Sequence, residues 1–233
     1  MRPLRYVFML ALAFGGLAWA MNTGRSLTGP MGAFLGAWLV MGAAVDLWSR
    51  TGKSGASRLF RLPRADWGKA VAHGGLGITM LGVAGLTAWQ TEDIRVAKLG
   101  EPFTVGGYTL TLDEVQDIQG PNYLSSMGFI TLSQDGQEIA QLRPEKRIYP
   151  VAQMPTTEAG IDYDLARDVY VVIGDEQVGG GWAVRTYIKP LTNWIWIGCG
   201  LMALGGLLSL SDRRFRVAAG ARKTAHKNAV PAE

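Results

Sequence analysis

The stretch AVAHGGLGITMLGVAGLTAW, residues 70–89, decides how the rest of the chain is interpreted. It has twenty residues and no formal charge. An α-helix that rises about 1.5 Å per residue covers the roughly 30 Å of bilayer hydrocarbon at that length. The stretch therefore predicts a transmembrane helix. Near its start lies His73, the chain's only histidine in an apolar setting.

Helical spacing places small residues on both sides of His73, because Ala70, Gly77 and Ala84 share its face of the helix. A flat ligand or a second helix could approach the backbone there. An ionisable residue inside a membrane tends to mark a functional site, and neutral imidazole is a good axial ligand of haem iron. A histidine that bonds to a neighbouring helix or reaches the membrane boundary is the alternative. On the residues alone both interpretations stand.

Three further apolar runs reach or nearly reach membrane-spanning length. They cover residues 6–21, 31–48 and 190–211. The predicted fold class is a membrane protein with four transmembrane α-helices, three of them within residues 1–90. The first run is the weakest, because Arg2, Arg5 and the sequence Ala18-Trp19-Ala20 also describe a cleavable signal peptide. We favour an uncleaved helix.

Basic residues are distributed unevenly around these runs. The net charge is +4, and the basic residues concentrate in the loop 49–69 and in the tail 212–233. The positive-inside rule places both segments in the cytoplasm, so residues 91–189 are expected on the opposite side of the membrane. Because the basic residues flank apolar runs and lack interleaved aromatic residues, they indicate membrane topology and no nucleic-acid binding.

Residues 91–189 show short alternating apolar runs separated by turn-forming residues, which is typical of strands. Glycine-containing turns favour three hairpins. They involve residues 104–112 turning at Gly106-Gly107, residues 127–132 with 137–142, and residues 168–174 with 182–188. A single strand after a turn is the alternative for residues 104–112. Five or six strands predict a small all-β domain, barrel-like or sandwich-like, inserted before the last helix. The polar segment 144–168 is expected to be less regular, as a docking surface or a solvated loop.

Self-sufficient catalysis is not indicated by any residue pattern. The sequence shows no nucleophile with an adjacent base, no Cys/His metal-binding spacing and no phosphate-binding glycine loop. A haem with two imidazole ligands needs one on each face of the ring, and the only other histidine, His226, lies in the basic tail. Met80 shares the helix face of His73. If His73 binds haem, its mate must come from another polypeptide.

Four segments carry a family resemblance. They are WGKAVAHGGLGITMLGVAG (67–85), GPNY (120–123), LRPEKRIYPVAQMPTTEAGIDYDLARDVYVVIG (142–174) and GGWAVRTYIKPLTNWIWIGCGLMALGGLLSLSDRRFR (180–216). Together they resemble the C-terminal third of CcmF, the large subunit of the bacterial cytochrome c haem lyase. The resemblance implies that His73 is an axial ligand of a b-type haem in the inner membrane. It also implies that the β domain faces the periplasm, where haem is attached covalently to apocytochrome c during cytochrome c maturation.

The resemblance further implies a set of partners. They are the N-terminal CcmF portion, lyase subunits of the CcmH and CcmI type, the haem chaperone CcmE and apocytochrome c. The tryptophan-rich WWD segment, its flanking histidines and the second membrane histidine of the family belong to the N-terminal two-thirds and have no counterpart here. We therefore expect the second haem ligand from another chain or from that N-terminal part, and we do not expect the chain to be catalytic alone. It would be half of a split gene product or a fragment.

A second hypothesis belongs to a different functional class. The chain could be a membrane-anchored periplasmic interaction or assembly module, in which a small β domain held between helices organises partners without a cofactor.

Overall fold

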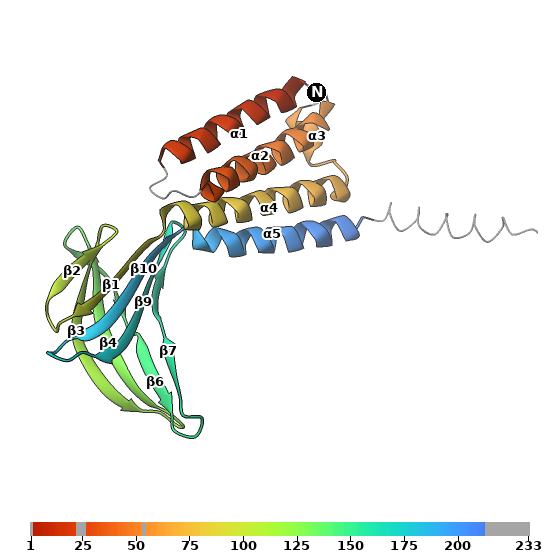
Figure 1. Ribbon diagram of the computed structural model, residues 1–233. Helices are drawn as coiled ribbons and strands as arrows, with labels where there is room; N and C mark the ends of the chain where they lie inside the picture. The colour runs from red at the N-terminus through yellow and green to blue at the C-terminus, as the bar shows by residue number, and fades with distance from the viewer. Residues whose placement is uncertain (1, 22–26, 53–54, 213–233) are drawn as a thin grey trace, which may run out of the picture. The chain divides into compact units, whose positions relative to one another are not determined.

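The computed structural model describes residues 2–21, 27–52 and 55–212 (Figure 1). The predicted basic tail lies outside this range beyond Asp212, and so does His226. The chain divides into two compact units. One comprises Met1–Ala84 with Trp194–Glu233, and the other comprises Gly85–Asn193.

The helices are α1 (Arg2–Ala20), α2 (Thr28–Ser49), the short α3 (Ala56–Leu59), α4 (Arg64–Trp89) and α5 (Thr192–Leu210). Among the described residues, three helices, α2, α4 and α5, are long and apolar enough to cross a membrane. The apolar part of α1, Leu4–Ala20, is shorter. A multi-pass membrane protein is therefore supported with three spans, and the fourth remains a prediction. Helix α4 begins at Arg64, before the predicted start at residue 70, so His73 lies further inside the helix than expected.

Glycines bring α4 and α5 into main-chain contact. A Cβ atom built on Gly75 would lie 2.7 Å from the carbonyl oxygen of Gly198, and one built on Gly68 would lie 2.6 Å from that of Gly205. Any side chain at these positions would push the helices apart. Close approach through small residues is the usual way in which helices associate in lipid.

Helix α2 packs against the small face predicted for α4. A Cβ atom on Gly36 would lie 2.8 Å from the carbonyl oxygen of Gly77, and one on Gly32 would lie 3.2 Å from the Cβ of Ala84. Of the two occupants expected for this face, a second helix covers its Gly77 and Ala84 end.

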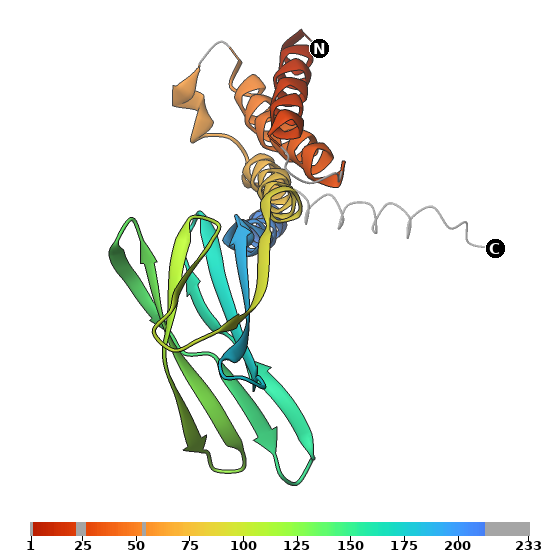
Figure 2. The same ribbon diagram turned by 60° about the vertical axis from the view of Figure 1, so that its left-hand side comes forward.

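The β unit contains ten strands. They are β1 (Thr91–Ala97), β2 (Pro102–Val105), β3 (Tyr108–Gln119), β4 (Leu124–Gln134), β5 (Gln137–Leu142), β6 (Glu145–Tyr149), β7 (Met154–Glu158), β8 (Gly160–Tyr163), β9 (Arg167–Glu176) and β10 (Trp182–Pro190). One sheet has the order β1-β10-β9-β8; the other has the order β2-β3-β4-β6-β7, with β5 also paired to β4. The named neighbours pair antiparallel, and the two sheets form a curved sandwich (Figure 2).

The core of this sandwich is built from aliphatic residues that alternate along the central strands. The fully buried ones include Leu110, Leu112, Ile130, Leu132, Val169, Val171 and Ile173. They come from β3, β4 and β9, which belong to different sheets. The expectation of a barrel-like or sandwich-like domain is thus met by a sandwich.

The three predicted hairpins are present. Strands β2 and β3 turn at Gly106 and Gly107, with φ of 56° and 87°, so the hairpin alternative holds. Strands β4 and β5 turn at Asp135 and Gly136, with φ of 51° and 80°. Strands β9 and β10 are joined through the glycines at 179–181. Positive φ is costly for most residues, which is why glycine was informative here.

Two expectations for the β domain were wrong. The five or six predicted strands are ten, and the segment 144–168, expected to be less regular, contains β6, β7 and β8. Its charges pair within and between strands: Arg147 Nε lies 2.8 Å from Glu145 Oε2 on the same strand, β6, and Arg147 Nη1 lies 3.3 Å from Glu158 Oε1 on the neighbouring strand β7. A polar segment therefore forms strands because its charges neutralise one another on the sheet surface.

Candidate functional site

The ring of His73 is exposed on α4 and is held by the helix itself. Its Nδ1 lies 2.8 Å from the main-chain carbonyl oxygen of Lys69, one turn earlier. Because a carbonyl oxygen only accepts, Nδ1 must carry the proton, and in the neutral ring Nε2 then keeps its lone pair. Histidines that bind metals commonly donate their other N–H to a carbonyl or a carboxylate in this way. This hydrogen bond leaves the lone pair of Nε2 available.

The ring of His73 borders a shallow depression of about 240 Å³ formed by α1, α2 and α4. Its lining is mostly apolar and includes Leu4, Trp38 and Leu39. Pockets that enclose a cofactor usually measure about 300–1,000 Å³. This depression can therefore contact only part of a flat ring system of tetrapyrrole size, and the remainder would need cover from outside the described residues.

An ionic cluster lies at the edge of this depression. Lys69 Nζ is 2.6 Å from Asp46 Oδ2, Arg50 Nε is 3.2 Å from the same oxygen, and Arg50 Nη1 is 2.7 Å from Asp66 Oδ1. Asp46 and Lys69 also line the depression. Two cations and two carboxylates balance, so the cluster adds no net charge beside the imidazole. Sequence reasoning singled out neither the cluster nor the Lys69 carbonyl contact.

The donor set decides which metal chemistry fits this site. Within residues 2–21, 27–52 and 55–212, no three side chains of His, Cys, Asp or Glu are grouped to hold a metal ion. His73 therefore offers one nitrogen and an apolar surround. This combination fits an axial ligand on one face of a haem, where the porphyrin supplies the other donors, and it does not fit a metal held by the described side chains alone.

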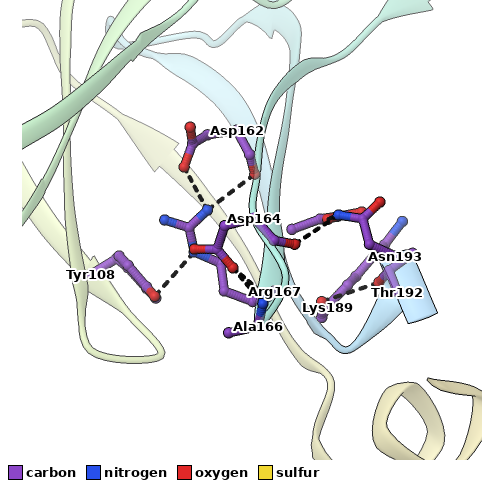
Figure 3. A network of polar contacts seen from close by, with 9 residues as sticks. Tyr108, Asp162, Asp164, Ala166, Arg167, Lys189, Thr192 and Asn193 are labelled. Atoms are coloured by element: carbon purple, nitrogen blue, oxygen red, sulfur yellow. Dashed lines mark hydrogen bonds and ion pairs between the residues drawn. The ribbon is translucent and has the colours of Figure 1, made fainter. Parts of the chain in front are cut away.

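A second polar cluster, in the β unit, is a structural one (Figure 3). The side chain of Arg167 is 9% exposed, donates from Nε to the Tyr108 hydroxyl at 3.0 Å, and pairs through Nη1 with the carboxylate of Asp162. Asn193 Nδ2 donates to the carbonyl oxygen of Asp164 at 2.7 Å. All of these groups belong to the β unit. Because the bonds reach Asp162, Asp164 and Arg167, which flank the turn between β8 and β9, the cluster stabilises that turn.

Comparison with known proteins identifies a family model and several relatives that the chain resembles. Residues 88–190 match the family model described as the CcmF C-terminal beta-sandwich. The chain is 57% identical over its full length to cytochrome c-type biogenesis protein ccl1 of Rhodobacter capsulatus, covering 35% of that protein. It is 41% identical to CcmF of Pseudomonas aeruginosa over 78% of this chain and 28% of that protein.

The fold is also similar to a solved structure. The match to a structure titled cytochrome c haem lyase CcmF has a TM-score of 0.67 at 23% identity, and it covers 88% of this chain and 34% of that one. The chain thus spans about a third of the length of the relatives it matches. Taken together, the matches to the C-terminal sandwich, to the curated relatives and to the solved fold show that the chain belongs to the CcmF family and corresponds to a C-terminal part of such proteins.

Proposed function

We propose that the chain acts in cytochrome c maturation as the C-terminal module of a haem lyase, and that His73 binds one face of a membrane b-type haem. The family membership supports the pathway. The observation that carries the ligand assignment is the hydrogen bond between His73 Nδ1 and the Lys69 carbonyl oxygen, which leaves Nε2 available beside an apolar depression.

Each residue of the site has a role in this proposal. When bound, haem supplies a redox-active iron, and His73 Nε2 would occupy one axial position. Trp38 and Leu39 would cover part of the apolar ring surface. Lys69, at the edge of the depression, is paired with Asp46 and has further N–H donors that would bond a haem carboxylate, although the cluster as a whole carries no net charge.

The proposal requires other polypeptides. The second axial ligand would come from the N-terminal CcmF portion or another chain, because His73 is the one histidine that lines the depression among the residues that the structure describes. CcmH- and CcmI-type subunits, the haem chaperone CcmE and apocytochrome c would complete the assembly. The chain would lie in a bacterial inner membrane, with its β domain in the periplasm and loop 49–69 in the cytoplasm, as the basic residues of that loop favour.

Co-expression with the N-terminal portion tests the ligand assignment. The purified complex should show a low-spin b-type absorption spectrum and haem by pyridine haemochrome analysis. His73→Ala should remove most of this haem, and His73→Gly should regain it when imidazole is added. His226→Ala, which removes the chain's other histidine, should leave the spectrum unchanged. A complex that keeps its spectrum in the His73→Ala variant would refute the assignment.

The same preparation separates the two functional hypotheses. A complex that retains its partner subunits but contains no stoichiometric haem would favour the cofactor-free interaction module. Retention of both would favour the haem lyase module.

Alkaline phosphatase fusions test the orientation. A fusion within the Ser133–Gly136 turn should be active, because this enzyme requires the periplasm, and a fusion after Arg216 should be inactive. The opposite result would reverse the proposed topology.

A further inference from the structure

A groove of about 660 Å³ lies within the β unit, between residues of β3, β4 and β6 on one side and of β9 and β10 on the other. Leu124 and Ile148, paired across β4 and β6, line it and are 53% and 49% exposed. Trp182 on β10 also lines it. Its volume is in the range of sites that bind ligands, and large apolar side chains exposed together mark interaction surfaces.

The groove carries a net negative charge. Three carboxylates line it, those of Asp117, Asp175 and Glu176, against one ammonium group, that of Lys146. Lys146, on β6, forms an ion pair with Asp175 on β9. A ligand with carboxylates of its own, such as haem, would be repelled here. The charge favours a cationic ligand with apolar groups.

One wall of the groove ends in an open strand edge. Strand β8 pairs with β9 only as far as Val171, which lies opposite Gly160. Beyond it, β10 is the single strand partner of β9 among the described residues, through Val172, Ile173 and Glu176, with a break in the register at residues 174–175. Unpaired main-chain groups at such an edge can accept an added strand, whose alternate side chains then enter neighbouring pockets.

We propose that this groove binds an extended segment of a partner protein, in which apolar side chains alternate with lysine or arginine, by strand addition to the open edge of β9. The apolar side chains would contact Leu124, Ile148 and Trp182. The cations would meet Asp117 and Glu176, as Lys146 already meets Asp175. This site does not depend on the haem proposal, because its residues lie in the β unit and those around His73 lie in the helical unit.

A synthetic peptide tests the proposal on the full chain in nanodiscs of zwitterionic lipid. A fluorescent heptapeptide of alternating lysine and valine should bind, by anisotropy, at least about tenfold more tightly than the same peptide with glutamate for lysine. Higher salt should weaken the binding. A peptide with alternate backbone nitrogens methylated should lose affinity, because it cannot donate to a strand edge.

Matched variants locate the binding. Glu176→Lys should weaken binding of the lysine–valine peptide about tenfold, whereas Glu138→Lys, the same change at an exposed site on β5 outside the groove, should leave it unchanged. Lys146→Met should strengthen binding, since it removes the groove's own cation. His73→Ala should have no effect on the peptide, which separates this test from the haem test.

Three outcomes would overturn the proposal. They are equal affinities for the lysine and glutamate peptides, equal effects of Glu176→Lys and Glu138→Lys, and full affinity of the methylated peptide.

Discussion

The sandwich and the helical unit bury opposite kinds of side chain. Leu112 and Leu132 in the sandwich are 0% exposed. In the membrane-spanning helices the residues that reach low exposure are mostly small, such as Ala33 and Ala84 at 2%, and large ones face outward, such as Leu207 at 67%. This pattern of burial is typical of a water-exposed domain in the sandwich and of lipid-exposed helices in the helical unit.

The difference follows from the solvent. In water, burial of aliphatic surface drives packing, so large side chains collect inside. In lipid, the surroundings are as apolar as leucine, and helices gain from close contact through small residues. This comparison predicts that the same substitution will have different effects in the two regions.

The largest expected difference concerns leucine. Leu112→Ala should destabilise the sandwich by about 2–5 kcal/mol, because it leaves a cavity in a packed core. Leu204→Ala in α5, where the leucine is 49% exposed, should cost less than about 0.5 kcal/mol. Denaturation of the full chain in detergent, followed by hydrogen exchange of strand and helix amides, would measure both. Equal costs would contradict the proposed division.

The next difference lies within the sandwich, between a buried and an exposed arginine. Arg167→Gln should cost about 1.5–3 kcal/mol, because it leaves the carboxylate of Asp162 and the hydroxyl of Tyr108 without their charged partner. Arg185→Gln breaks an ion pair with Glu92 in which Arg185 is half exposed, and it should cost less than about 1 kcal/mol. Thermal unfolding would rank the stabilities of the two variants. A larger loss of stability in Arg185→Gln than in Arg167→Gln would show that burial is not the deciding factor.

A third test compares neighbouring glycines in α4. A Cβ on Gly75 would meet the backbone of α5, so Gly75→Ala should destabilise the helix pair by about 1–3 kcal/mol. A Cβ on Gly74 would meet no neighbouring helix within 4 Å, so Gly74→Ala should stabilise the helix by up to about 1 kcal/mol. Unfolding in mixed micelles with increasing SDS would report both signs. Effects of the same sign would argue against main-chain contact at Gly75.

The smallest expected effect depends on pH. Hydrogen bonds from Arg147 and, to a smaller extent, from Ser125 lower the pKa of Glu145 below its usual 4.5. The ionised carboxylate therefore stabilises the sandwich above about pH 4.5, and this contribution is lost as the pH falls through the lower folded-state pKa.

Glu145→Gln should remove that dependence, at a cost of at most about 1 kcal/mol at neutral pH. The free energy of unfolding between pH 7 and pH 3 would measure it. Ser125→Ala should remove a smaller part of the pH dependence. A steeper pH dependence in Glu145→Gln than in the unchanged protein would contradict the pairing of Glu145 with Arg147.

Glycine explains which strands could be predicted from sequence. The turns at Gly106-Gly107 and Asp135-Gly136 require positive φ, and such residues are visible without a structure. Strand β1 was missed because its residues, TEDIRVA, are mostly polar, and it pairs with β10 almost a hundred residues later. A strand partner so far away in the sequence cannot be predicted from a local pattern.

The site was predictable only in its local parts. His73 stood out because it is an ionisable residue in an apolar helix, and its contact with Lys69 could have been inferred from four-residue helical spacing. The pairing of Lys69 with Asp46 could not, because it depends on the packing of α2 against α4. The groove in the β unit also needs tertiary structure, since its residues come from five strands.

The acceptor that orients the His73 ring is a peptide oxygen, and this has a consequence for how a haem pocket could mature. A peptide oxygen is retained whatever side chain occupies position 69. The imidazole is accordingly oriented as soon as the helix has formed. In the haem lyase module that we propose, the order in which other subunits join would then be free, because none of them is needed to choose the ligating nitrogen.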